Sequence, residues 1–431
     1  MSSLKSPALR HNLLIGLVLA MGCTIEKGAT DNNEIDDGTD DNLDDGTNDD
    51  DDGDNTIDSG DDSGSADADD ATALRGVIID INGHPIDDVT VTSSTGDTTE
   101  TDSTGLWAFE DNELEDAGDI AIDFNKSGYA FNQKPISIVN GNDHSLNVTL
   151  AAVDFTGDFD GAEGLSIDMD DGGATVDLPA GTYLDENGEP YTGTIYVEST
   201  LFDVTYKAPN GSNAVQEVSE RSAAPGDFSA LDSDGDEAIL ESFGMIQVNL
   251  YNADGEEVQI PEGQTATIKI SMQGGSSVAG DAIPAWSYDE DAYKWIEEGE
   301  GVVNDNNGTL EWEFEASHFS SWNTDYPVST WGCIQCQGAD LYTMGVSGLS
   351  VSADGVDYNA TTSASADTSG DLCVDVKNDA TVALTLTYTL SGQTNSDVFD
   401  ETIQVPGFQA LCDDGTNACT DIGDCPLNIP W

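Results

Sequence analysis

The sequence predicts an all-β fold, with tandem antiparallel β-sandwich domains that follow a disordered acidic N-terminal tether. Beyond residue 72, short runs rich in Val, Ile, Thr, Tyr and Phe alternate with Asp-Gly, Asn-Gly and Pro-Gly pairs about every ten residues. No sustained helical period interrupts these runs. At roughly 100–200 residues per domain, the 431 residues have room for about two to four domains.

The charge and hydropathy of the chain exclude three classes of protein. It has 11 Lys and Arg against 85 Asp and Glu, a formal net charge of −74. Nucleic-acid and anionic-lipid binders are excluded, because the attraction to phosphate that drives such binding would become a repulsion. With 37% hydrophobic residues, the chain is also too polar for a polytopic membrane protein.

Residues 1–22 have the pattern of a secretion signal. Lys5 and Arg10 precede an apolar run from Leu13 to Met21. This run is about half as long as a helix that crosses a bilayer. We therefore expect the protein to be exported.

The signal ends in Leu19-Ala-Met-Gly-Cys23, which resembles the bacterial lipobox. The resemblance implies that Cys23 is acylated (with palmitate-type chains), becomes the first mature residue and anchors the protein to the membrane. Thr24 is not the Asp that retains many such lipoproteins at the inner membrane, so the resemblance favours an outer-membrane or cell-surface location on a bacterium. Alternatively, the signal peptide is an ordinary one and Cys23 is incidental; Cys23 would then be an unpaired exported thiol beside six other cysteines.

Residues 23–72 form the predicted tether. Nineteen of the forty residues 31–70 are acidic, and none is Lys, Arg or aromatic. Such a segment cannot bury enough apolar surface to offset its ordering entropy, so we expect a disordered spacer of about 40 Å. The alternative, a calcium-binding repeat, lacks the ligand spacing of an EF-hand loop.

Residues 73–152 form the first predicted sandwich. Strand-like runs flank the turn Asn82-Gly-His-Pro85, and Leu106-Trp-Ala-Phe109 follows. This order resembles the carboxypeptidase regulatory-like domain, a transthyretin-related sandwich with a carbohydrate-binding-like fold. The resemblance implies a rigid, noncatalytic module. Trp107 either packs in its core or stacks on a sugar ring.

Residues 153–327 form the second predicted unit. It contains Leu178-Pro-Ala-Gly-Thr-Tyr183 and Glu241–Leu250, and it ends in His318-Phe-Ser-Ser-Trp-Asn323. This succession resembles the middle region of cartilage intermediate layer protein and its relatives. Because that family is extracellular and matrix-associated, the resemblance implies a scaffold or adhesion role.

Residues 328–431 form the third predicted unit, a small disulfide-containing sandwich. It holds an even set of cysteines, which in an exported chain predicts up to three disulfides with fifteen possible connectivities. These are Cys333, Cys336, Cys373, Cys412, Cys419 and Cys425. The alternatives for Cys333-x-x-Cys336, zinc binding or redox chemistry, lack a matched second pair and a strand-to-helix junction respectively.

One acidic cluster of the chain is a candidate cation site. Asp232, Asp234 and Asp236 alternate in a Gly-containing loop, and such carboxylates could bind Ca²⁺ weakly. Glu237 stands where an EF-hand loop needs its Gly. The alternative is a solvated hairpin tip. We expect no required cofactor, with calcium as the candidate.

Catalytic motifs are missing from the sequence. His84, His144 and His318 lie in turn or aromatic settings, and no nucleophile elbow, zinc-protease helix, phosphate loop or dinucleotide fingerprint occurs. A peptidase or glycosidase would need a partnered His–Ser or two perturbed carboxylates in one cleft. We therefore expect no enzyme activity.

The acidity also predicts a habitat. Residues 73–431 carry 65 acidic and eight basic residues, and their mutual repulsion is screened by salt. We expect a bacterium from a saline environment.

Together these observations predict a membrane-anchored, surface-exposed, noncatalytic lipoprotein that serves in binding, adhesion or scaffolding, with an extracellular protein or glycan of unknown identity as its partner. The alternative is a carbohydrate-binding module that presents or captures polysaccharide.

Overall fold

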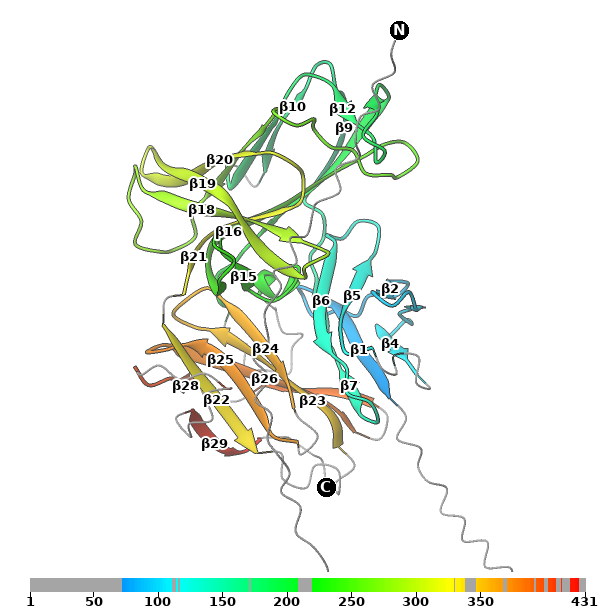
Figure 1. Cartoon of the computed structure of the whole chain (residues 1–431), viewed down its shortest axis with the longest axis vertical. Helices are drawn as coiled ribbons and strands as arrows, with labels where there is room; N and C mark the ends of the chain where they lie inside the picture. Colours follow the sequence, from blue (N-terminus) through cyan, green and yellow to red (C-terminus); the bar gives the residue numbers. More distant parts are fainter. Residues whose placement is uncertain are drawn as a thin grey trace, which may run out of the picture. The chain divides into compact units, whose positions relative to one another are not determined.

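The computed structural model describes residues 72–110, 114, 117–169, 172–207, 219–328, 330–337, 346–366, 370–390, 393–398, 402–407, 412 and 419–425. These residues form 29 β-strands and one short 3-10 helix, η1 (Glu220–Ala223), so the all-β prediction is confirmed (Figure 1). The predicted signal peptide, Cys23 and nearly the whole tether lie outside the described residues. Among the described residues, no helix is long and apolar enough to span a membrane.

The first unit consists of two four-stranded sheets that face each other. One has the order β4-β1-β7, with β8 also paired to β1, and the other has the order β3-β2-β5-β6. The strands are β1 (Ala73–Asp80), β2 (Thr90–Ser93), β3 (Thr98–Glu100), β4 (Leu106–Phe109), β5 (Asp119–Asn125), β6 (Asn132–Ser137), β7 (Asp143–Ser145) and β8 (Val148–Leu150). Both sheets contribute to one core. Trp107 lies in that core, edge-on to Phe109 and Phe124, so it packs and does not present its ring to a ligand.

The middle unit is built on one eleven-stranded sheet. Its order is β10-β11-β17-β20-β19-β18-β21-β16-β14-β9, with β15 paired to β16 and β19. Its strands, including the separate pair β12–β13, are β9 (Phe155–Asp160), β10 (Leu165–Met169), β11 (Ala174–Leu178), β12 (Tyr183–Leu184), β13 (Pro190–Tyr191), β14 (Thr194–Phe202), β15 (Ser229–Leu231), β16 (Glu237–Tyr251), β17 (Ala266–Ser271), β18 (Ala282–Asp289), β19 (Lys294–Asn306), β20 (Thr309–Ala316) and β21 (Ser321–Pro327).

Strands β16 and β17 touch, although four strands separate them in the sheet order. The sheet therefore folds over on itself. The contact is close at the bulge in β16, where a Cβ on Gly244 would stand 2.6 Å from Cγ2 of Ile270. Glycine is therefore required at this point for the two layers to meet.

The last unit contains two smaller sheets. They have the orders β25-β22-β29 and β24-β23-β26-β27, with β28 paired to β26. The strands are β22 (Trp331–Gln337), β23 (Val346–Gly355), β24 (Thr361–Ser365), β25 (Leu372–Lys377), β26 (Thr381–Leu390), β27 (Gln393–Val398), β28 (Ile403–Gln404) and β29 (Thr420–Asp424).

One five-residue turn recurs along the chain. Its first residue accepts hydrogen bonds from the amides of the third and fifth residues through a side-chain oxygen, and a Gly with positive φ stands fourth, as in hairpins that combine a type I turn with a bulge. The turn begins at Asp80, Asp102, Asp185, Asp232 and Asn252. The Asp-Gly and Asn-Gly punctuation of the sequence thus corresponds to one structural device.

Candidate functional site

A polar pocket with aromatic walls lies between the first and middle units. Its volume is about 350 Å³, and it is bounded by the loop after β5 and by strands β14 and β16. We call it the tyrosine–amide pocket. Its lining combines three aromatic rings, three side-chain amides and two opposite charges: Tyr129, Phe131, Tyr251, Asn125, Gln247, Asn249, Lys126 and Glu198.

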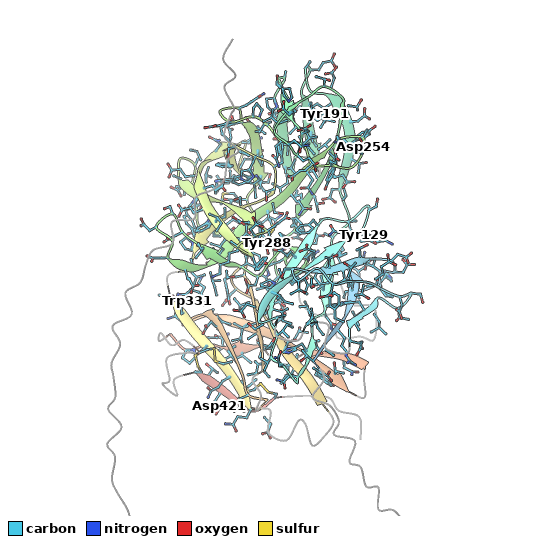
Figure 2. All side chains as sticks on the ribbon, turned by 45° about the vertical axis from the view of Figure 1, so that its right-hand side comes forward. Tyr129, Tyr191, Asp254, Tyr288, Trp331 and Asp421 are labelled. Carbon is cyan, nitrogen blue, oxygen red and sulfur yellow. A yellow bond between two sulfur atoms is a disulfide. The ribbon has the colours of Figure 1, made fainter. Side chains whose placement is uncertain are left out.

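Buried Gln247 fixes the aromatic wall of this pocket. Its side-chain oxygen accepts the amide of Phe131 at 2.9 Å, while Nε2 donates to the Phe131 carbonyl at 3.1 Å and to Ser321 at 2.9 Å. A turn at Gly128, where φ is 83°, places Tyr129, labelled in Figure 2. Lys126 ties the loop down by donating to the Asp87 carbonyl at 2.7 Å.

The two tyrosines of the pocket remain neutral phenols near neutral pH. Burial, together with nearby carboxylates that include Glu198, raises the pKa of Tyr251 to about 12. Burial, Asp80 and Asp87 raise the pKa of Tyr129 as well. Each hydroxyl can therefore donate and accept a hydrogen bond. Rings beside amides and hydroxyls suit a neutral, polyhydroxylated ligand.

A second, larger hollow is lined by serine hydroxyl groups together with apolar side chains. It has a volume of about 600 Å³ and lies among the first unit, the β18–β19 turn and strands β23 and β24. Its hydroxyl-bearing lining includes Ser137, Ser229, Ser350, Ser352, Ser363 and Ser365. Tyr293 borders it from the turn with a φ of 59°, an unfavourable conformation for a bulky side chain.

The predicted calcium ligands lie at the tip of the β15–β16 hairpin. Oδ1 of Asp232 accepts the amides of Asp234 and Asp236 at 3.0 and 2.8 Å, which makes this cluster one copy of the recurrent turn. Among the described residues, the potential metal ligands whose atoms come within 4.8 Å of one another are three cysteines, Cys333, Cys373 and Cys419. The three aspartates do not form such a group. Calcium binding at the hairpin tip stays a prediction.

The six cysteines of the last unit form three disulfides, as predicted. The pairs are Cys333–Cys419, Cys336–Cys425 and Cys373–Cys412. Cys333 and Cys336 therefore bind different partners, although only two residues separate them. The even cysteine count set a maximum of three bonds, which the structure reaches, and left their pairing open.

The three histidines contact neighbouring groups rather than a shared centre. Nδ1 of His84 lies 3.3 Å from Asp80, and Nε2 of His144 contacts the backbone of Val139. Nε2 of His318 lies 2.9 Å from Glu298. Burial opposes the charge on His318, but the bond to Glu298 outweighs it and raises the pKa of the imidazole.

The closing motif of the middle unit, His318 to Asn323, has a structural explanation. The indole N–H of Trp322 donates to the His318 carbonyl at 3.2 Å, and the imidazole ring lies against the indole. Ser320 donates to the Tyr288 carbonyl at 3.0 Å. Asn323 accepts a hydrogen bond from buried Ser242 at 2.6 Å. These bonds fasten the end of the unit to its own sheet.

Sequence reasoning missed the buried or half-buried charged groups at the junctions between units. Arg221 of η1 donates a hydrogen bond to the last unit, and Lys134 of β6 donates one to the segment after η1. Lys377 of β25 donates one to Glu241 of β16. Asp325 is fully buried in β21. In a chain with 85 acidic residues, one buried carboxylate has no distinguishing sequence signal.

Comparison with protein families gives a partial match. Residues 221–327 match the family model described as FAM171A1/A2/B, N-terminal. Human cartilage intermediate layer protein 2 is 28% identical over 121 residues, which cover 28% of this chain and 9% of that protein. Mouse cartilage intermediate layer protein 1 is 24% identical over 130 residues, which cover 30% of this chain and 10% of that protein.

The predicted similarity to cartilage intermediate layer proteins is therefore confirmed over a limited stretch, and the chain spans about a tenth of the length of these relatives. The resemblances to a lipoprotein and to a carboxypeptidase regulatory-like domain stay predictions. Among solved structures, the Bacillus anthracis TIE protein aligns with a TM-score of 0.18 at 10% identity, covering 82% of this chain and 50% of that chain. BcpA, the major pilin subunit of Bacillus cereus, aligns with a TM-score of 0.17 at 12% identity, covering 82% and 98%.

Proposed function

We propose that this protein is a noncatalytic surface lipoprotein of a bacterium that presents a rigid β-rich head for binding, adhesion or scaffolding. The observation that carries the proposal is the fastening of the three units to one another by buried contacts. An adhesive or scaffold protein must transmit a load or keep several surfaces in register, and hinged domains would do neither.

The segment after η1 is the centre of this fastening. Lys134 of the first unit donates to the carbonyls of Ala224 and Gly226 at 2.7 and 2.6 Å. Burial lowers the pKa of Lys134 to about 8, while Asp227 and Asp354 act in the opposite direction. At neutral pH the ammonium therefore remains charged and binds the two carbonyl oxygens.

Arg221, within η1 itself, contacts the last unit. Its side chain is inaccessible to solvent, and it donates to the carbonyls of Gly355 and Tyr358 at 3.1 and 3.3 Å. Asp354 lies 3.5 Å from the guanidinium and supplies a counter-charge. A third cation, Lys377, joins Glu241 at 2.6 Å. Three of the eight basic residues beyond residue 72 thus serve junctions between units.

The first and middle units are joined by neutral contacts as well. The Tyr288 hydroxyl, labelled in Figure 2, donates to Gln133 at 2.8 Å, and Asn132 donates to the Ala223 carbonyl at 3.1 Å. Such buried, directional bonds allow one relative placement of the two sheets, since a shifted arrangement would leave polar groups unpaired.

Acylation of Cys23 and export supply the location in this proposal, and the acidic tether supplies distance from the membrane. The test is expression of the full chain in a bacterium fed an alkyne-tagged fatty acid. We expect a labelled, surface-accessible protein, whereas Cys23→Ser should be unlabelled and released. Equal labelling of both forms, or accessibility only after cell lysis, would contradict the location.

The binding role is tested with the same cells. Cells that display the full chain should adhere to at least one extracellular-matrix extract or polysaccharide in high salt, and cells with Cys23→Ser should not. Parallel wells with Ca²⁺ or a chelator show whether the 232–236 turn takes part. Adhesion equal to that of cells without the protein on every surface would refute the proposal.

A second candidate, carbohydrate binding, is favoured by the tyrosine–amide pocket. If a glycan binds there, Tyr129→Ala should weaken binding about tenfold by removing a stacking ring. Tyr191→Ala, which truncates a tyrosine on β13 outside the pocket, is the matched control. Equal affinities for the two variants would exclude this pocket as the glycan site.

A further inference from the structure

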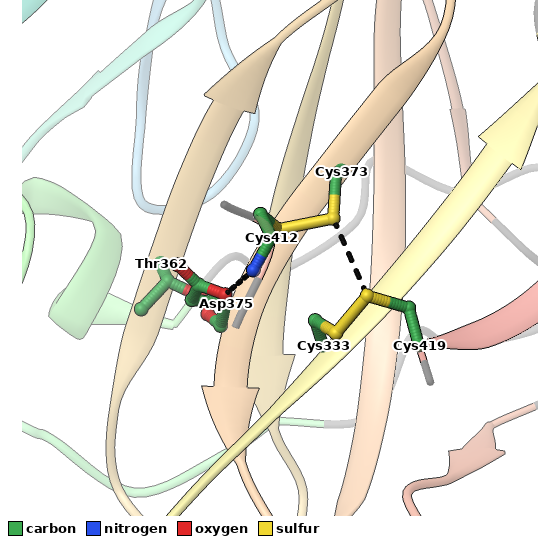
Figure 3. The surroundings of a disulfide bond; sticks show 6 residues. All are labelled: Cys333, Thr362, Cys373, Asp375, Cys412 and Cys419. Atoms are coloured by element: carbon green, nitrogen blue, oxygen red, sulfur yellow. Dashed lines mark hydrogen bonds between the residues drawn. A yellow bond between two sulfur atoms is a disulfide. The ribbon is translucent and has the colours of Figure 1, made fainter. Parts of the chain in front are cut away.

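Two disulfides of the last unit lie in contact. Sγ of Cys373, which is bonded to Cys412, stands 3.7 Å from Sγ of Cys419, which is bonded to Cys333. Figure 3 shows the two bonds side by side, with a dashed line joining the nearest sulfurs. The Cys412 amide donates to Asp375 at 2.9 Å and thereby fixes the approach of that cysteine.

The cysteines of this group differ in access. Cys373 and Cys412 line an open cavity of about 270 Å³, which is large enough to admit a small molecule. Cys333 behind them is buried, with 2% of its surface exposed. The third disulfide, Cys336–Cys425, is formed by two buried residues.

We infer that the Cys373–Cys412 bond is a modification site for small thiols, and that its opening moves the neighbouring disulfide. A thiolate enters the cavity and attacks Sγ of Cys412, forming a mixed disulfide and expelling the Cys373 thiolate. The Cys373 thiolate then attacks Sγ of Cys419, 3.7 Å away, and expels the Cys333 thiolate. Two S–S bonds break and two form, so no oxidant or reductant is consumed.

The products define a new cross-link pattern. Cys412 carries the small thiol, Cys373 is joined to Cys419, and Cys333 becomes the free thiol. The first end of strand β29, at Cys419, is then covalently joined to β25 instead of β22, while Cys336–Cys425 still joins the other end of β29 to β22, its hydrogen-bonded neighbour. Modification therefore replaces one of the two covalent links between β22 and β29 by a link between β25 and β29.

The charge around the cavity selects the thiol. Asp227, Glu237 and Asp375 line it together with Lys294, whose ammonium is paired with Glu237 at 2.7 Å. The surplus of carboxylates repels anionic thiols and attracts cationic ones. We therefore expect cysteamine to react faster than 2-mercaptoethanesulfonate.

The experiment treats the full-length oxidised protein with cysteamine, quenches with acid, unfolds and alkylates free thiols, and maps the peptides by mass spectrometry. We expect cysteamine on Cys412, the alkyl group on Cys333 and a Cys373–Cys419 peptide, with Cys336–Cys425 intact. An alkyl group on Cys373 with Cys333–Cys419 intact would refute the transfer. Reaction of Cys336–Cys425 at an equal rate would refute the assignment of the site.

A pair of variants tests the transfer without added thiol. Cys412→Ser leaves Cys373 as a permanent thiol beside the 333–419 bond and should yield a mixture of Cys333–Cys419 and Cys373–Cys419. Cys425→Ser is the control: it leaves Cys336 unpaired and should keep the other two native pairings. Only Cys333–Cys419 in the first variant would contradict the proposal, and the thiol treatment of the unaltered protein decides if a variant does not fold.

The preference for cationic thiols is tested separately, by comparing the rates at which two thiols modify Cys412. After correction for thiolate concentration, cysteamine should modify Cys412 about tenfold faster than 2-mercaptoethanesulfonate in low salt, and the ratio should approach one in 1 M NaCl. A ratio near one at low salt would show that the carboxylates do not steer the thiol.

Discussion

The middle and last units are both largely antiparallel β structures, each with one parallel pair, but they are stabilised differently. The middle unit encloses a core of its own, which includes Val248, Trp312 and Trp322 and contains no cysteine. The buried residues of the last unit, such as Val351 and Leu384, belong instead to a core shared with the middle unit. The last unit also holds all three disulfides. A short segment with a domain-like sequence pattern thus depends on its neighbour and on covalent bonds.

The sharpest test of this difference is full reduction with a phosphine. The three disulfides join residues separated by 86, 89 and 39 positions, and each such bond contributes about 4 kcal/mol in the chain-entropy account. Hydrogen exchange should then accelerate in β22, β25 and β29 and change little in β11, β17 and β20. Simultaneous loss of protection in both sets would show that the middle unit has no independent stability.

The next largest effect is expected for Arg221→Met, which removes the contacts that this side chain of the middle unit makes with the last unit. The substitution leaves the carbonyls of Gly355 and Tyr358 without their donor and Asp354 without its counter-charge. Breaking a buried pair of this kind costs about 3–5 kcal/mol. In denaturant, the last unit should unfold earlier, in a separate transition.

Lys377→Met is the comparison for that variant, because it breaks an ion pair at the same junction in which both side chains retain some solvent contact. Its loss should be smaller, about 1 kcal/mol. Equal losses for the two variants would mean that burial of the guanidinium does not set the strength of the junction.

These junction residues mark the limit of what the sequence could predict. Hairpins are local: an Asp or Asn, a Gly three positions later and alternating apolar residues suffice to predict strands, turns and the all-β class. The Arg221–Gly355 bond joins positions 134 residues apart, and the sequence around either residue does not predict its partner. The pairing of the cysteines was open for the same reason, since their count limits the number of bonds but does not identify the partners.

The candidate site was even less accessible to sequence reasoning. Trp107, the aromatic residue considered for sugar stacking, lies in the core, whereas the tyrosine–amide pocket takes its rings from two units. Tyr129 and Tyr251 are separated by more than a hundred residues and meet because Gln247 binds the backbone of Phe131. Their convergence is a tertiary property.

Asp325→Asn should have the opposite effect to the junction variants, because it should stabilise the middle unit. Burial, aided by the nearby Glu241, raises the pKa of Asp325 well above its ordinary value, against the opposing effects of Ser242 and the Phe243 amide. Below the unfolded pKa of about 3.9 both states are protonated. As pH rises above it, the unfolded state loses this proton first, so wild-type stability falls.

The variant lacks this titration. Its advantage in the free energy of unfolding should therefore be small at pH 4 and grow to about 1–2 kcal/mol at pH 7.5. Denaturant titrations of both proteins at the two pH values measure it. Asp325→Ala is the control for volume, since it removes the carboxyl but opens a cavity. A difference independent of pH would show that the proton on Asp325 does not matter.

The smallest effect is expected at a single turn of the middle unit. Asn252 accepts the amides of Asp254 and Glu256, both at 2.9 Å, and donates to the Glu256 carboxylate at 2.7 Å. Asn252→Ala should lower the stability of the middle unit by about 1 kcal/mol and leave exchange in the last unit unchanged, because no junction contact is lost. Asn252→Asp keeps the acceptor but places two carboxylates together, so its loss should be largest in low salt and fade in 1 M NaCl. A salt-independent loss equal to that of the Ala variant would mean that the amide donor, not the acceptor that defines the recurrent turn, holds this hairpin.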